Sequence, residues 1–266
     1  MHFLHYQQLA ETTAQFAIHK EWGQGRSIFG GLTAALVLTH IEAQVDLSER
    51  DLRTVNIHFC GATQADFPCQ LRHRVLSYGK SVIQVEGQLL QNGEVKTAIV
   101  ACFTLPRRSS ISIDLPAKQF PLSIEQAPKL VFEKGKLPDF VQYFDLRYTN
   151  NNIPFSGSKD SLISGWMRFA NPTEPLDNSG IIALIDAWPP AILPMLTKRA
   201  PSSTITWNME FMYPRPALTI ADLLYYQCNA IEADQGYAHT EGKIYHPCGR
   251  LLALTRQMIG VYDKVD

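Results

Sequence analysis

Apolar residues follow two different periodicities along the first part of the chain. Between Leu52 and Phe103, four runs alternate apolar and polar residues, with turn signals near 63–68, 78–79 and 92–93, and this pattern predicts an antiparallel meander. Before the meander, the apolar residues of LTAALVLTHIEAQV recur every three or four positions, as in a buried helix. We therefore expect a helix followed by an antiparallel sheet.

The same order of elements returns after a stretch that five prolines interrupt, at 106–140. LISGWMRFAN alternates like a strand, GIIALIDAWPPAIL has the apolar pattern of a helix, and strand-like runs continue from Ser203 to Tyr262. We expect an N-terminal unit over 1–105, a linker over 106–140 and a C-terminal unit over 141–266.

The two units also correspond residue by residue. EGQLLQNGEVKTAIVACF aligns with EGKIYHPCGRLLALTRQMI if the second turn holds one extra residue, so that Gly93 matches Gly249, and NIHF aligns with NMEF. Each unit has an apolar helix, as a helix wrapped by a curved antiparallel sheet requires. Two such units are expected to pair their sheets edge to edge, which would cover exposed strand edges.

Reactive groups are divided unequally between the two units. Asp186 lies in the middle of the predicted second helix and has no acidic counterpart in the first, while Thr204 aligns with Leu52 and Gln257 aligns with Ala101. A carboxylate, a hydroxyl and an amide on neighbouring elements can bind and activate one water molecule, with Asp186 accepting its proton. This set of residues indicates hydrolysis.

The first unit contributes a different feature, the pair Gly30 and Gly31 at the start of its helix. Unpaired backbone N–H groups and the positive end of the helix dipole suit a developing oxyanion there. The glycine pair and the acid belong to opposite units, so we expect one composite site at their interface.

Each of these residues also has a purely structural interpretation. Asp186 can cap a backbone group or pair with Lys198 or Arg199, and Thr204 and Gln257 can be ordinary strand residues. The glycine pair can serve close packing alone.

The composition of the chain limits the expected binding partners and indicates a cellular location. A net charge of −1 and a pI near 6.7 give no positive field for nucleic acid or an anionic membrane. No run approaches a membrane span and the N-terminus lacks signal-peptide features, so a cytoplasmic location is expected. The five cysteines contain no CxxC pair, which predicts reduced thiols and no zinc site.

Over nearly its whole length the chain resembles the acyl-CoA thioesterase II (TesB-like) group of double-hotdog proteins. The resemblance rests on FGG at 29–31, on NIHF, ALIDAWPPAIL and TITWNMEF, and on GRLLALTRQ near the end. It implies an α+β double hotdog in which an Asp, a Thr and a Gln of the second unit hold the hydrolytic water. These roles carry over onto Asp186, Thr204 and Gln257.

The resemblance further implies an acyl-CoA substrate, with its acyl chain in an apolar tunnel and its CoA arm at the surface. It implies a role in fatty acid metabolism, a homo-oligomer, and no metal or organic cofactor. Thr206-Trp207 and Glu210 depart from the family pattern, which bears on the substrate. Five arginines are candidates for contacts with CoA phosphates: Arg53, Arg72, Arg74, Arg107 and Arg108.

Two other functions are weighed against hydrolysis. The first is a non-catalytic acyl-CoA-binding protein in which Asp186 is buried and structural. The second is a hotdog dehydratase or hydratase, which needs a catalytic His beside an acid. No histidine occurs in the second helix or in the glycine loop, although candidates stand elsewhere in the chain: His19, His40, His58, His73, His239 and His246.

Overall fold

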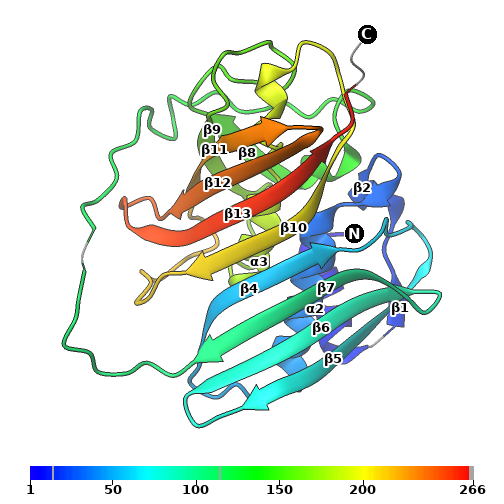
Figure 1. Ribbon diagram of the computed structural model, residues 1–266, viewed down its shortest axis with the longest axis vertical. Helices are drawn as coiled ribbons and strands as arrows, with labels where there is room; N and C mark the ends of the chain where they lie inside the picture. Colours follow the sequence, from blue (N-terminus) through cyan, green and yellow to red (C-terminus); the bar gives the residue numbers. More distant parts are fainter. Residues whose placement is uncertain (14, 114, 264–266) are drawn as a thin grey trace.

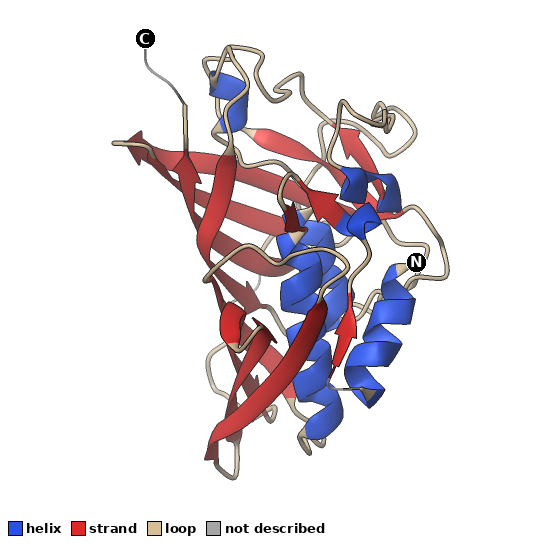
Figure 2. Ribbon diagram, turned by 90° about the vertical axis from the view of Figure 1, so that its right-hand side faces the viewer, coloured by secondary structure: helices blue, strands red, loops and turns tan. Residues whose placement is uncertain are grey.

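The computed structural model describes residues 1–13, 15–113 and 115–263. Eleven strands form one curved antiparallel sheet in the order β1-β5-β6-β7-β4-β10-β13-β12-β11-β9-β8, and the helices pack against one of its faces (Figures 1 and 2). A two-stranded sheet, β2-β3, lies beside it.

The first half supplies five strands of the large sheet: β1 (Gln15–Ala17), β4 (Asp51–Phe59), β5 (Pro68–Tyr78), β6 (Val82–Gln91) and β7 (Glu94–Thr104). The second half supplies the other six: β8 (Phe144–Tyr148), β9 (Ile163–Phe169), β10 (Ser202–Phe211), β11 (Leu224–Asp234), β12 (Tyr237–Tyr245) and β13 (Leu251–Val261). The remaining elements are β2 (Gly23–Gln24), β3 (Ser27–Ile28), the helices α1 (Phe3–Thr12), α2 (Gly30–Gln44) and α3 (Asn178–Asp186), and the short 3-10 helices η1 (Lys20–Trp22), η2 (Asp139–Tyr143) and η3 (Leu193–Met195).

The predicted meander and the edge-to-edge pairing are both confirmed. β4 to β7 follow one another as antiparallel strands, and β4 of the first half pairs with β10 of the second. Asn56 lies opposite Asn208 in this joint, and the Asn208 side-chain amide donates to Asn56 Oδ1 over 2.9 Å. Because these two residues are also equivalent in the repeat, the joint lies on an approximate two-fold axis. The α+β double-hotdog prediction is therefore correct.

α2 and α3 lie under the sheet and run antiparallel to each other. The Thr39 hydroxyl in the second half of α2 donates to Ser179 Oγ at the start of α3 over 2.9 Å. Residues 31–41 and 179–185 are buried, as expected for helices wrapped by sheet. Within the described residues, no helix is both long and apolar enough to cross a membrane.

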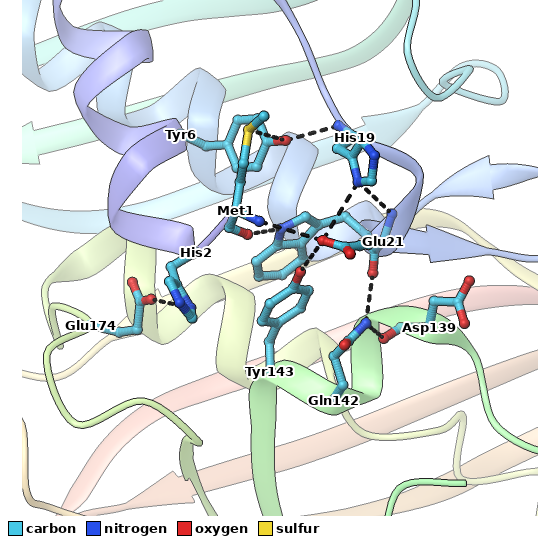
Figure 3. Close-up of polar contacts among 10 residues, drawn as sticks. Met1, His2, Tyr6, His19, Glu21, Asp139, Gln142, Tyr143 and Glu174 are labelled. Atoms are coloured by element: carbon cyan, nitrogen blue, oxygen red, sulfur yellow. Dashed lines mark hydrogen bonds and ion pairs between the residues drawn. The ribbon is translucent and has the colours of Figure 1, made fainter. Parts of the chain in front are cut away.

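The N-terminal helix α1 is absent from the sequence predictions, and the second half of the chain holds it in place. The backbone N–H of Leu4 donates to the Glu174 carboxylate over 2.6 Å, which satisfies one of the unpaired amides of the first turn. Figure 3 shows Glu174 beside His2, and Tyr143 and Gln142 of η2 reaching Glu21. α1 and the chain that follows it are thus tied to the second hotdog.

α2 approaches the sheet most closely at Gly87 on β6. A Cβ at Gly87 would lie 2.6 Å from Val37 Cγ1 and 2.7 Å from Ile41 Cδ1. We expect Gly87→Ala to lower the free energy of unfolding by about 1–3 kcal/mol, because the added methyl overpacks this contact. Gly61→Ala is the matched control, since a Cβ there would have nothing nearer than 3.5 Å. Urea unfolding of both variants checks this, and equal stability of the two would contradict it.

Candidate active site

A cavity of about 400 Å³ lies where β4 ends and β10 begins, at the junction of α2 and α3. Gly30, Asp186, Thr204 and Gln257 all line it, so the structure brings together four of the five predicted residues. Gly31 contacts the cavity indirectly, because its backbone N–H donates to the Asp186 carboxylate. Both hotdogs therefore contribute to one site.

Asp186 is the last residue of α3, so its predicted position in mid-helix is wrong. The helix cannot continue because Pro189 and Pro190 follow, and a proline ring clashes with the carbonyl four residues before it. The chain turns away after Ala187, and the carboxylate faces the cavity at the helix end.

The carboxylate of Asp186 is packed against the helix start of the other hotdog. A Cβ at Gly30 would lie 3.2 Å from Asp186 Oδ2, and one at Gly31 would lie 2.7 Å from Asp186 Cβ. Burial raises the pKa of Asp186 to about 7, although the hydrogen bond from the Gly31 N–H favours the charged form. A side chain at Gly31 would overlap Asp186, whereas one at Gly30 would only crowd Asp186 and Phe59. This agrees with the close-packing interpretation of the glycine pair.

A bulge in β10 turns Thr204 toward the cavity. The register against β13 shifts between Thr204 and Thr206, which adds one residue and reverses the alternation of side chains before that point. Gln257 lies opposite Trp207, whose ring is buried, so it points to the same inner face. The Thr204 hydroxyl donates to Gln257 Oε1 over 3.3 Å.

This hydrogen bond leaves each partner with capacity for a further one. The Thr204 oxygen keeps its lone pairs as acceptors, and the Gln257 Nε2 has no hydrogen bond to any of the described residues in the structure. The pair can accept one hydrogen bond and donate another to a small molecule in the cavity.

The wall beside Asp186 is aromatic. Trp188 stacks on Tyr226 with ring centroids 5.4 Å apart, and Tyr148 meets Trp188 edge-on at 5.1 Å. Gly165 makes room for the indole, because a Cβ there would lie 2.5 Å from Trp188 Cη2. Burial keeps the pKa of Tyr226 well above its usual value, so its phenol stays neutral. Of these rings, Trp188 lines the cavity together with Asp186.

Sequence reasoning missed other lining residues. Phe59 and Thr97 come from the first hotdog, and the free thiol of Cys60 stands at the exposed side of the cavity. Periodicity assigns all three to strands and their ends, and only the fold brings them to the cavity that Asp186 lines.

The equivalent strand positions of the first hotdog lack the hydroxyl and the amide. The bulge of β10 recurs in β4 between Leu52 and Thr54, so Leu52 occupies the place of Thr204, and Ala101 that of Gln257. At the other junction of α2 and α3, Glu42 accepts a hydrogen bond from Asn178 over 2.8 Å. Burial raises the pKa of Glu42 to about 7 as well, yet this residue does not line the Asp186 cavity.

None of the five candidate arginines for CoA lines the cavity. Arg53 lies at the opposite end of β4, with its guanidinium 4.5 Å from the Tyr213 ring centroid, and Arg74 pairs with Glu86. Among the described residues, no three His, Cys, Asp or Glu side chains gather to hold a metal ion.

Comparisons with known proteins agree with this architecture. Residues 18–104 match the model of the acyl-CoA thioesterase N-terminal domain, and residues 122–261 match that of the acyl-CoA thioesterase C-terminal domain. No curated protein matches the chain at a significant level.

Solved structures share the fold over nearly the whole chain. A conserved protein of unknown function with a hot dog fold from Alicyclobacillus acidocaldarius is 22% identical, with a TM-score of 0.81, and the match covers 96% of this chain and 95% of that one. A putative thioesterase II from Thermobifida fusca YX is 16% identical, with a TM-score of 0.78 and coverage of 94% and 92%. An acyl-CoA thioesterase II, TesB2, from Mycobacterium marinum is 21% identical, with a TM-score of 0.72 and coverage of 94% and 93%.

The raised pKa of Asp186 predicts a particular dependence of stability on pH. The folded chain holds the proton up to about pH 7, whereas an ordinary aspartate releases it near 3.8, so stability is full below pH 3.8 and declines as the pH rises to 7. Asp186→Asn, which can still accept from Gly31, should raise the melting temperature at pH 8 by roughly 5 °C, with little change at pH 3.5. Thermal unfolding at both pH values measures this. A variant less stable than wild type at pH 8 would mean that the charge holds the fold together.

Proposed function

The chain belongs to the acyl-CoA thioesterase family, and on that basis we propose that it hydrolyses an acyl-CoA thioester to a free acid and CoA. The observation that carries this proposal is a desolvated carboxylate with a pKa of about 7, facing a hydroxyl and an amide across one cavity. A base that titrates near neutral pH is suited to removing a proton from water.

In the proposed reaction, a water molecule donates one hydrogen bond to Asp186 and one to the Thr204 oxygen. Its oxygen attacks the carbonyl carbon of the thioester while Asp186 takes its proton. Gln257 Nε2 donates to the attacking water and orients it. The C–S bond then breaks, and the sulfur leaves with the proton from Asp186, which restores the carboxylate.

The role of the Gly30–Gly31 pair follows from its contact with the acid. Once Asp186 accepts a proton it loses its charge, so its hold on the Gly31 N–H weakens. We propose that this N–H then donates to the oxygen of the tetrahedral intermediate, where negative charge has developed. The Gly31 N–H would thus donate to Asp186 before the proton transfer and to the oxyanion after it.

The alternatives receive less support from the site. None of the residues that line the cavity is a histidine, which disfavours a dehydratase or hydratase. A non-catalytic binding protein does not account for the Thr204–Gln257 pair beside a desolvated acid in one hotdog only. The acyl group, the cytoplasmic location, the part in fatty acid metabolism and the homo-oligomer stay predictions.

Asp186→Asn should reduce turnover of acyl-CoA by about 10²- to 10⁴-fold, because the general base is lost while the shape of the site is kept. Release of free thiol from acyl-CoAs of increasing chain length measures this. Glu42→Gln is the matched control, since it also neutralises a buried carboxyl with a pKa of about 7 but lies outside the cavity. Full activity of the Asp186 variant, or an equal loss in both variants, would refute the assignment.

The pH dependence of kcat/KM should follow the ionisation of Asp186. We expect the rate to rise about tenfold per pH unit on the acid side and to level off above an apparent pKa of about 7, because only the carboxylate accepts a proton. Glu42→Gln should leave this profile in place. A rate that stays constant between pH 5 and 8 would argue against an active-site base with a raised pKa.

A further inference from the structure

A second depression, of about 380 Å³, adjoins the active-site cavity. The hairpin of β2 and β3 lies between the two: Gln24 lines the cavity, Arg26 lines the depression, and Ser27 lines both. A molecule that enters the cavity beside Ser27 can therefore continue into the depression.

The depression is positively charged by two exposed cations, Lys20 and Arg26. Neither forms an ion pair with any other described residue of the chain. Asp139 is the one carboxylate in the lining, and Glu21, next to Lys20, is already engaged by the Tyr143 hydroxyl over 3.1 Å (Figure 3). Unpaired cations beside a substrate cavity favour a ligand that carries phosphate groups.

The lining of the depression has apolar groups for a ring as well as cations for phosphates. Ala65, Leu137 and Pro138 form an apolar part of its lining, and glycines supply bare backbone elsewhere. At Gly135, with φ of +82°, a side chain would strain the backbone as well as fill the space. Leu137 and Pro138 belong to the connection between the hotdogs, so that segment also takes part in the proposed ligand site.

The chain separation keeps this depression within reach of the acid for a ligand with a phosphopantetheine arm, which CoA carries. Arg26 precedes Gly30 by four residues, so their Cα atoms lie at most about 14 Å apart. The pantetheine arm of CoA, from sulfur to phosphate, has a covalent length of about four residues and the same reach. With its thioester carbonyl beside Asp186 and Gly30, CoA is therefore long enough for its phosphates to reach Arg26.

We propose that Lys20 and Arg26 bind the phosphates of CoA, and that the apolar lining from Ala65, Leu137 and Pro138 receives its adenine. This inference rests on the proposed thioesterase function and assigns the residues that hold the nucleotide end of CoA. It also replaces the five arginines that the sequence suggests for this role.

The test is the double variant Lys20→Glu/Arg26→Glu, assayed on one acyl group carried by CoA and by pantetheine, which lacks the nucleotide. KM for the CoA thioester should rise about 10- to 100-fold with kcat nearly unchanged, because charge-assisted hydrogen bonds to phosphate are lost. Hydrolysis of the pantetheine thioester should not change. The wild-type KM for the CoA thioester should also rise with salt, and the variant should lose most of this dependence.

Lys243→Glu/Arg250→Glu is the matched control, since both residues are exposed and line neither the cavity nor the depression, and the change in charge is the same. Equal losses on both substrates, an unchanged KM for CoA, or an effect confined to a thioester on acyl carrier protein would overturn the inference. Failure of the thioesterase proposal has a different signature: the wild-type protein would hydrolyse neither substrate.

Discussion

The pairing of β4 with β10 is the constraint on which the rest of the molecule depends. It joins two half-sheets into one and fixes their register at Asn56 and Asn208. Because the strands are antiparallel, the end of β4 lies beside the start of β10, and the two helices beneath must run in opposite directions. The start of α2 therefore meets the end of α3, and Gly30 of one hotdog touches Asp186 of the other.

The symmetry of this arrangement produces two helix junctions, and the sequence distinguishes them. One holds Asp186 beside a hydroxyl and an amide, whereas the corresponding strand positions of the other carry Leu52 and Ala101. The carboxyl of Asp186 is costly to ionise, so it lowers the stability of the charged fold, and its raised pKa gives it the basicity that the proposed water activation needs. Stability and chemistry are thus opposed at Asp186. Glu42 at the other junction also has a pKa raised to about 7 by burial, but it does not line the cavity.

Much of the fold and of the candidate site could be predicted from the sequence, because the internal repeat shows each main element twice. The meander, the apolar helices and the unequal distribution of Asp186, Thr204 and Gln257 are all visible as pattern. Asp186 was predicted in mid-helix, but it lies at the helix end. The apolar pattern of the sequence continues through Pro189 and Pro190, whereas a helical backbone cannot continue through them. α1 was missed because the polar Gln7 shares its buried face with Phe3, Tyr6 and Ala10, and the amide of Gln7 is satisfied by the distant Asp177. The depression at Arg26 was missed because segments far apart in the chain form it.

The central claim is that a water molecule activated by Asp186 attacks the thioester directly, and one single-turnover measurement tests it. Enzyme in excess would hydrolyse an acyl-CoA in water enriched in ¹⁸O, and mass spectrometry would measure how much ¹⁸O the released acid contains. Direct attack by water predicts one ¹⁸O atom in the acid from the first turnover. Acid that carries only ¹⁶O in the first turnover would show that a carboxylate of the protein attacked instead, and would contradict the role assigned to Asp186.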